Sequence, residues 1–270
     1  MSNKNGNVFF RYKSMEKKIA AQTLDIIENQ RLYCPAPNLL NDPFECQANI
    51  SFDAPLEVKN ERAKERLMKE NFEMTETEAK QHATVRWTQV EEGGIKGALS
   101  WLYKDWGVIS FSAIKDNILM WSHYAGSHNG ICIEFRRCLD EKHANFGEHV
   151  NFFAQAHEVQ YSQNLPTVNF YTTSRIEKIR ALILTKLDQW SYEKEWRIIM
   201  PPDAISKSRY VPVPAGVITA IYLGCKITEE NRDAVLQILQ KTQNKGVRVF
   251  QAKQKSDAYG LYFEPISMSI

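Results

Sequence analysis

The segment Trp190-Ser-Tyr-Glu-Lys-Glu-Trp-Arg197, followed by Ile198-Ile-Met200, joins a helical pattern to an apolar, strand-like run. Its two carboxylates, Glu193 and Glu195, are two residues apart, so in an extended chain they would lie on one face. Like charges on one face repel each other unless a cation, a metal ion or a cationic transition state compensates them. This stretch is therefore a candidate site at the point where the chain enters a strand.

The alternative is structural, namely a solvated strand edge on which Glu195 forms an ion pair with Arg197 or Lys194. Surface charges of this kind are common and need no function. However, large aromatic side chains flank the carboxylates, and such side chains usually wall a pocket or a core. They are Trp190, Tyr192 and Trp196.

The composition is that of an ordinary globular protein of 270 residues, with 43% hydrophobic and 24% charged residues. A net charge of +2 gives no basic field that would by itself indicate a nucleic-acid partner. The N-terminal segment is polar, and no apolar run approaches the ~18 residues that span a bilayer. We therefore expect a single domain over residues 1–270 that is cytoplasmic and has no membrane contact.

The cysteines are odd in number, scattered and without C-x-x-C spacing, which predicts reduced thiols and not disulfides or a zinc site. They are Cys34, Cys46, Cys132, Cys138 and Cys225. His123 and His128 are five residues apart, off the helical i, i+4 face of a metal pair. The sequence predicts no metal site.

The periodicity predicts a mixed α+β fold with a split, mostly antiparallel sheet around a cleft and helices outside it. Strands are expected over residues 8–12, 31–34, 106–112, 131–135, 157–161, 217–224, 247–250 and 259–263, and in the run that ends at Met200. Helices are expected over 15–29, 174–190 and 228–241, with a short one holding residues 117–124. Residues 138–155 read as a loop. A charged helical insertion is expected over about 55–105, as a lid or a partner surface.

Polar side chains recur beside aromatics on three of these strands. They are Arg11, the pair Ser110 and Ser112, and the pair Glu193 and Glu195. Cleavage of the nicotinamide–ribose bond of NAD needs such a set, because a carboxylate stabilises its oxocarbenium-like transition state. An arginine binds phosphate or ribose through a bidentate fork, a serine orients the ribose, and aromatic rings hold the departing nicotinamide.

The order arginine, Ser-x-Ser, Glu-x-Glu resembles the R-S-E arrangement of ADP-ribosyltransferases. The resemblance implies that Arg11 contacts NAD, that Ser110 or Ser112 takes the serine role, that Glu195 is catalytic and that Glu193 serves the acceptor. Ser110-Phe-Ser112 stands where that family usually has Ser-Thr-Ser. The resemblance also implies a sheet of the ADP-ribosyltransferase type.

The chain as a whole resembles a large bacterial family known as domain of unknown function 2971. The matching segments are Arg11-Tyr12, Asn41-Asp-Pro-Phe-Glu45, Ser110-Phe-Ser112 through Met120-Trp-Ser-His-Tyr124, His128-Asn-Gly130, and Trp190 to Arg197. The family label carries no activity. Similar proteins that modify DNA, RNA or proteins suggest, by analogy, a toxin or phage-defence setting.

Asn41 and Asp42 precede Pro43 and so favour a rigid turn that aims Asp42 or Glu45 into a cleft. The alternative is a structural turn with Phe44 inserted in the core. The residues expected to contact NAD are Arg11, Tyr12, Asn41, Asp42, Phe44, Trp121, His123, Tyr124 and Tyr192.

Three functional hypotheses remain. The first is an NAD-dependent ADP-ribosyltransferase, or NAD glycohydrolase, that acts on a nucleic acid or protein acceptor and has an antitoxin or regulatory partner. The second is a metal-dependent nuclease or hydrolase in which a divalent cation is held by Asp42, Glu45, Glu193 and Glu195. The third is a non-catalytic binding or sensor module whose partner surface is the charged segment 55–85.

Overall fold

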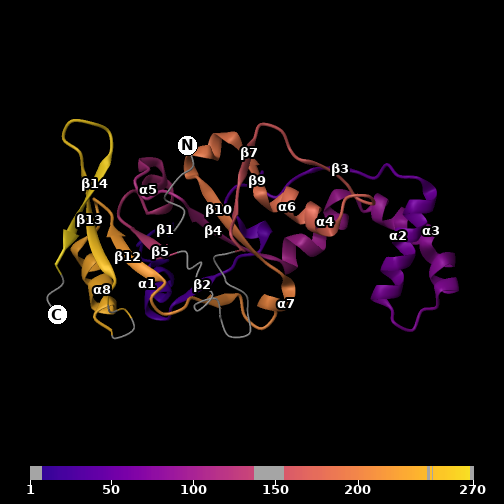
Figure 1. Ribbon diagram of the computed structural model, residues 1–270, viewed down its shortest axis with the longest axis horizontal. Helices are drawn as coiled ribbons and strands as arrows, with labels where there is room; N and C mark the ends of the chain where they lie inside the picture. Colours follow the sequence, from indigo (N-terminus) through magenta and orange to yellow (C-terminus); the bar gives the residue numbers. More distant parts are fainter. Residues whose placement is uncertain (1–7, 137–154, 242–243, 245, 268–270) are drawn as a thin grey trace. The chain divides into compact units, whose positions relative to one another are not determined.

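The computed structural model describes residues 8–136, 155–241, 244 and 246–267 (Figure 1). Cys138 and all but the last residue of the expected loop 138–155 lie outside that part. The chain divides into two compact units. Unit 1 comprises Met1–Pro35, Val108–Val159 and Gln189–Ile270, and unit 2 comprises Ala36–Gly107 and Gln160–Asp188.

Unit 1 is built on a mostly antiparallel sheet with the strand order β14-β13-β12-β5-β1-β4-β10-β6. The strands are β1 (Val8–Lys13), β4 (Gly107–Ser112), β5 (Ile131–Arg136), β6 (His157–Glu158), β10 (Glu195–Met200), β12 (Ile218–Leu223), β13 (Arg248–Gln254) and β14 (Leu261–Ile266). Strands β12 and β13 are parallel, and α8 (Glu229–Leu239) connects them, as parallel neighbours require. Figure 1 shows α8 beside these two strands. The protein is thus a mixed α/β structure with a large, mostly antiparallel sheet.

The two faces of this sheet carry separate apolar cores. On the α1/α8 face, Phe9, Ile133 and Ile198 pack with residues of α1 (Ala20–Glu28) and α8. On the α5 face, Phe10 and Tyr12 pack with residues of α5 (Ile118–Tyr124). Side chains alternate between the faces along each strand, so the position of a polar residue in its strand decides which core it joins.

Smaller elements complete unit 1. The short strands β2 (Arg31–Tyr33) and β11 (Tyr210–Pro212) pair with each other. The turn of helix α7 (Pro202–Ile205) follows β10 and buries Ile205 in the core of the α1/α8 face. The 3₁₀ helix η4 (Asp188–Glu193) precedes β10, with Lys194 between them.

Unit 2 is mainly helical, with α2 (Leu56–Glu70), α3 (Glu76–Glu92), α4 (Gly94–Asp105) and α6 (Arg175–Leu184). Residues 55–105, the expected insertion, hold the first three of these helices. Helices α2 and α3 lie side by side (Figure 1), and ion pairs such as Arg86–Glu70 at 2.8 Å link them. Unit 2 also contains the 3₁₀ turn η1 (Pro37–Leu39) and the strand pairs β3 (Asn49–Ser51) with β8 (Thr167–Asn169), and β7 (Gln160–Ser162) with β9 (Thr185–Leu187).

The helix expected over residues 174–190 ends earlier than its apolar pattern indicates. Its first turn has a capping box between Ser174 and Glu177, but its last helical residue is Leu184. Lys186 in β9 then forms an ion pair with Glu45 at 3.0 Å, and both side chains are only 3% exposed. In place of the last helical turns that the apolar pattern predicts, the chain pairs β9 with β7 and buries this ion pair. No helix in the described ranges has the length and apolar character that crossing a bilayer requires.

The backbone just after β12 lies very close to the segment that contains His128 and Gly130. A Cβ added at Gly224 would lie 2.1 Å from the carbonyl oxygen of His128 and 2.9 Å from that of Gly130. The amide nitrogen of Gly224 donates to Gly130 O at 2.9 Å, so these two segments cannot separate without losing a hydrogen bond. This position therefore requires glycine.

We predict that Gly224→Ala lowers the free energy of unfolding by about 2–3 kcal/mol, because the new methyl group displaces backbone. The matched control is Gly97→Ala in α4, where a Cβ meets nothing within 4 Å. Alanine is the better helix former by about 1 kcal/mol, so the control should be neutral or stabilising. Urea unfolding of both variants measures the difference, and equal stabilities would contradict the close approach.

Candidate functional site

The two carboxylates of the Glu-x-Glu pair lie on either side of a sharp turn. Glu193 is the last residue of η4, Lys194 has a φ of +47°, and Glu195 is the first residue of β10. The extended conformation expected across the pair is therefore wrong. Two tertiary hydrogen bonds hold the turn: Ser112 Oγ donates to Glu193 O at 2.6 Å, and Ala113 N donates to Lys194 O at 2.9 Å.

Glu195 forms a bidentate ion pair with Arg197. Arg197 Nε is 2.7 Å from Glu195 Oε1, and Arg197 Nη2 is 2.9 Å from Glu195 Oε2. The side chains are only 1% and 6% exposed for Arg197 and Glu195 respectively. The sequence suggested this pairing as an alternative, but on a solvated edge. A buried pair is a much stronger constraint, because loss of either partner leaves a charge without compensation in the core.

Glu193 is held by the helix that packs on the sheet. Tyr124, the last residue of α5, donates its hydroxyl to Glu193 Oε1 at 2.6 Å, and Glu193 is only 3% exposed. Asn117 caps α5 through its Oδ1, and its Nδ2 donates to Tyr192 O at 3.1 Å. The same short helix therefore orients the carboxylate and fixes the backbone that precedes it.

Aromatic contacts join the two motifs that the sequence singled out. His123 Nδ1 lies 3.0 Å from the hydroxyl of Tyr192. The His123 ring is 6.3 Å from that of Trp190 and 6.1 Å from that of Tyr192, in edge-to-face geometry. We call His123, Tyr124, Trp190, Tyr192 and Glu193 the α5–η4 cluster.

Strands β1, β4 and β10 are neighbours, so the predicted arginine, serines and glutamates lie on three adjacent strands. Phe10 pairs with Ser112, which places Ser112 on the α5 face. Trp196 and Ile198 pack in the core of the α1/α8 face, so Glu195 alternates onto the α5 face as well. Ser112, Glu195 and the α5–η4 cluster therefore share one side of the sheet.

Arg11 lies on the other side. It pairs with Ile133 of the α1/α8 core, and its guanidinium is 5.8 Å from the centre of the Phe111 ring. Arg11 Nη1 donates to the carbonyl oxygen of Ser110 at 3.3 Å. Burial lowers the pKa of Arg11 to about 10, whereas the charges of Cys34 and Glu195 act in the opposite direction. Arg11 thus interacts with Glu195 electrostatically but does not share its face.

Tyr12 and Trp121, both expected to contact NAD, are core residues. They are 6% and 0% exposed, and their rings meet edge to face at 5.4 Å. Tyr12 donates its hydroxyl to Ile114 O at 2.9 Å, and Trp121 Nε1 donates to Lys115 O at 2.8 Å. They hold α5 and the segment before it on the sheet, and so position the cluster.

In unit 2, the segment Asn41–Glu45 forms the expected turn, with Asp42 Oδ1 accepting from Phe44 N at 2.9 Å. Phe44 is 69% exposed, so the alternative that placed it in the core is wrong. Asp42 and Glu45 line a cavity of about 730 Å³. Glu45 also holds the buried ion pair with Lys186.

Sequence reasoning missed a second polar centre on the α5 face. Glu134 accepts hydrogen bonds from Thr219 at 2.7 Å, Tyr222 at 2.7 Å and Arg248 at 2.9 Å. Burial and Glu134 together raise the pKa of Tyr222. A charged residue inside the otherwise apolar run Ile131–Phe135 was the only sequence sign of this centre.

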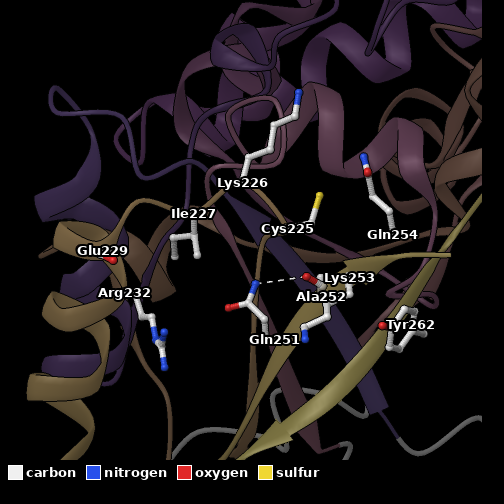
Figure 2. Close-up of a pocket in the computed structure, with 10 residues that line it drawn as sticks. All are labelled: Cys225, Lys226, Ile227, Glu229, Arg232, Gln251, Ala252, Lys253, Gln254 and Tyr262. Atoms are coloured by element: carbon white, nitrogen blue, oxygen red, sulfur yellow. Dashed lines mark hydrogen bonds between the residues drawn. The ribbon is translucent and has the colours of Figure 1, made fainter. Parts of the chain in front are cut away.

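A pocket of about 670 Å³ lies where β12 ends and α8 begins. Figure 2 shows Lys226 and Arg232 extending in opposite directions, so the basic side chains of this pocket do not converge on one point. Lys253 is engaged in an ion pair with Glu264 at 2.6 Å. Gln251 donates to the carbonyl oxygens of Gly224 and Ala252. This pocket therefore has fewer polar side chains available to bind a ligand than its composition indicates.

Within the described ranges, no group of three or more His, Cys, Asp or Glu side chains could hold a metal ion. Asp42 and Glu45 belong to unit 2, whereas Glu193 and Glu195 belong to unit 1.

Comparison with known proteins adds one finding. The family model described as "Protein of unknown function (DUF2971)" matches residues 120–198, which supports membership of that family. The match begins at Met120 in α5 and ends at Ile198 in β10, so it contains every residue of the α5–η4 cluster together with Glu195 and Arg197. No curated protein and no solved structure matches the chain.

From the buried ion pair we predict that loss of either partner destabilises the protein. Glu195→Gln and Arg197→Met should each lower the free energy of unfolding by about 3–5 kcal/mol, because each removes the bidentate partner of a buried charge. The double variant removes both charges and should lose clearly less than the sum of the two. Urea unfolding of all four proteins measures the coupling, and strict additivity would contradict the pair.

A second prediction concerns the link between α5 and η4. Tyr124→Phe removes only the hydroxyl that donates to Glu193 and should lower the free energy of unfolding by about 1.5–3 kcal/mol. Tyr259→Phe is the matched control, because Tyr259 is fully exposed, and it should be neutral. Equal melting temperatures for the two variants would refute the role of this hydrogen bond.

Proposed function

We propose that the protein is an NAD-dependent ADP-ribosyltransferase, or an NAD glycohydrolase of the same design, with its active site at Glu195 and the α5–η4 cluster. One observation carries the proposal: a serine and two oriented carboxylates share the end of β4 and the start of β10, beside a group of aromatic rings. Cleavage of a nicotinamide–ribose bond uses a carboxylate that stabilises the developing positive charge and ring surfaces that hold the nicotinamide.

The proposed step is a displacement at C1′ of the nicotinamide ribose. The bond from C1′ to the nicotinamide nitrogen breaks, its electron pair goes to the ring nitrogen, and nicotinamide leaves uncharged. The carboxylate of Glu195 stabilises the positive charge that develops on the ribose, and Arg197 fixes its orientation. An acceptor oxygen or nitrogen forms the new bond to C1′, and its proton passes to Glu193. With water as the acceptor, the product is ADP-ribose.

The remaining groups bind and orient the substrate. Trp190, Tyr192 and His123 offer ring surfaces to the nicotinamide. Ser112 supports the turn between the carboxylates through Glu193 O. Arg11 lies on the opposite face, so we assign it a positioning role on the backbone of β4 and not a contact with NAD.

The proposal includes a macromolecular acceptor and a sheet of the ADP-ribosyltransferase type. A toxin or phage-defence setting, with an antitoxin or regulatory partner, fits an enzyme that modifies macromolecules. The family match supports the location of the site, because it spans both motifs that form it.

Release of nicotinamide tests this function. The purified protein, incubated with NAD and a cell extract as acceptor source, should release nicotinamide. Glu195→Gln should lower the rate by about 10²–10³-fold, as loss of one preorganised electrostatic group does. The matched control is Glu158→Gln on the neighbouring strand β6, where an exposed carboxylate changes to an amide in the same way.

Because Glu195→Gln also disturbs Arg197, its melting temperature is recorded and the rate is measured well below it. Glu195→Gln/Arg197→Met serves as a second inactive variant, in which the charge of Arg197 is removed together with that of Glu195. The proposal is wrong if the wild-type protein releases no nicotinamide, or if both Glu195 variants retain the wild-type rate.

A further inference from the structure

Unit 2 contains a pocket of about 350 Å³ that is lined mainly by basic side chains. Helices α2 and α6 supply five of them, with a single acidic residue, Glu65, beside them. The basic residues are Arg62, Arg66, Lys69, Arg175 and Lys178. Five like charges around one small pocket repel each other, and nearby anions are required to compensate this repulsion.

The carboxylates of unit 2 do not meet that need. Arg62 pairs with Glu65 at 3.0 Å and Arg66 with Glu70 at 2.7 Å, and both pairs are on the surface. In contrast, Lys69, Arg175 and Lys178 have no carboxylate partner within ion-pair distance in the part of the chain that the structure describes. A surplus of positive charge therefore remains at the pocket after the internal ion pairs have formed.

Lys178 shows the electrostatic consequence. Its Nζ donates to the carbonyl oxygen of Phe170 and lies 4.8 Å from the centre of the Phe170 ring. Burial, together with the charges of Arg62 and Arg66, lowers the pKa of Lys178 to about 8. A bound anion would stabilise the protonated amine.

Aromatic rings accompany these cations. The guanidinium carbon of Arg175 lies 4.7 Å from the centre of the Trp101 ring, and Trp101 and Phe170 both line the pocket. Trp101 and Trp106 meet edge to face at 6.3 Å. Cations interleaved with aromatic faces are the chemistry by which proteins hold the backbone and the bases of single-stranded nucleic acids.

We infer that this pocket binds a single-stranded nucleic acid, with phosphates on Lys69, Arg175 and Lys178 and a base stacked on Trp101. A single strand fits better than a duplex, because stacking on a side chain requires an exposed base face. The binding site goes beyond the proposed function.

Fluorescence anisotropy tests the binding with the full chain and no NAD. The probes are 5′-labelled 15-mers of dT and of U, titrated at several salt concentrations. Lys69→Gln/Arg175→Gln removes two phosphate contacts from exposed positions, so it should weaken binding at least about 10-fold. The slope of log K against log salt should become shallower by about 1.4, the value for two phosphates on a single strand.

Two further measurements separate this pocket from general electrostatic attraction. Trp101→Ala should weaken binding about 5- to 100-fold without changing the salt slope, because it removes stacking and no charge. Affinity should fall as the pH rises from 7 to 9, since Lys178 loses its proton in that range. The other charged groups at the pocket are Arg62, Glu65, Arg66 and Lys69 on α2 and Arg175 on α6, whereas α4 contributes Leu99 and Trp101.

The matched control is Lys226→Gln/Arg232→Gln, which removes two exposed basic residues from unit 1 and should leave affinity unchanged. A preference for the dT probe would identify the ligand as DNA, and a preference for the U probe would identify it as RNA. Either result supports the inference. The inference is overturned if neither probe binds at low salt, if the control loses as much affinity as Lys69→Gln/Arg175→Gln, or if a duplex binds more tightly. Because NAD is absent, failure here and failure of nicotinamide release are separate results.

Discussion

The bidentate ion pair between Arg197 and Glu195 is the interaction on which the candidate site depends. Taking both ions out of water costs several kcal/mol each, and only good geometry with a matched partner offsets that cost. The fork at 2.7 and 2.9 Å supplies that geometry. It fixes the side chain of Glu195 at the start of β10, on the same face of the sheet as Ser112. A hydrophobic pair of similar volume could stabilise the fold as well, so stability alone does not require two charges at this position.

The second carboxylate is fixed by different means, through a neutral donor on a helix. Tyr124 reaches Glu193 only because α5 is capped by Asn117 and anchored by Trp121 on the sheet. The turn at Lys194 then separates the two carboxylates, so each has its own environment. Groups of the same kind in different surroundings can take different chemical roles, which is how paired carboxylates act in glycosyl transfer. The family model matches residues 120–198, a range that contains both carboxylates.

The sequence predicted which motifs come together better than it predicted their geometry. Alternating apolar runs predicted most of the central strands, and the motifs around Tyr124 and Glu193 do come together. An extended chain across Glu193–Glu195 was wrong because hydrogen bonds from Ser112 and Ala113, some 80 residues away, impose the left-handed Lys194. Local propensity contains no trace of such partners. The face on which Arg11 lies also depends on distant partners, through the strand register. The helix that ends at Leu184 is a third case, because burial of Lys186 with Glu45 overrides the apolar stripe that predicted a longer helix.

A crystal structure of the protein with carba-NAD tests the central claim most directly. This analogue replaces the ring oxygen of the nicotinamide ribose with a methylene group, so it binds without being cleaved. Our account predicts that C1′ lies next to the carboxylate of Glu195, that the nicotinamide contacts Trp190 or Tyr192, and that Arg197 still holds Glu195. An analogue bound away from β4 and β10, or no bound analogue at saturating concentration, would contradict it.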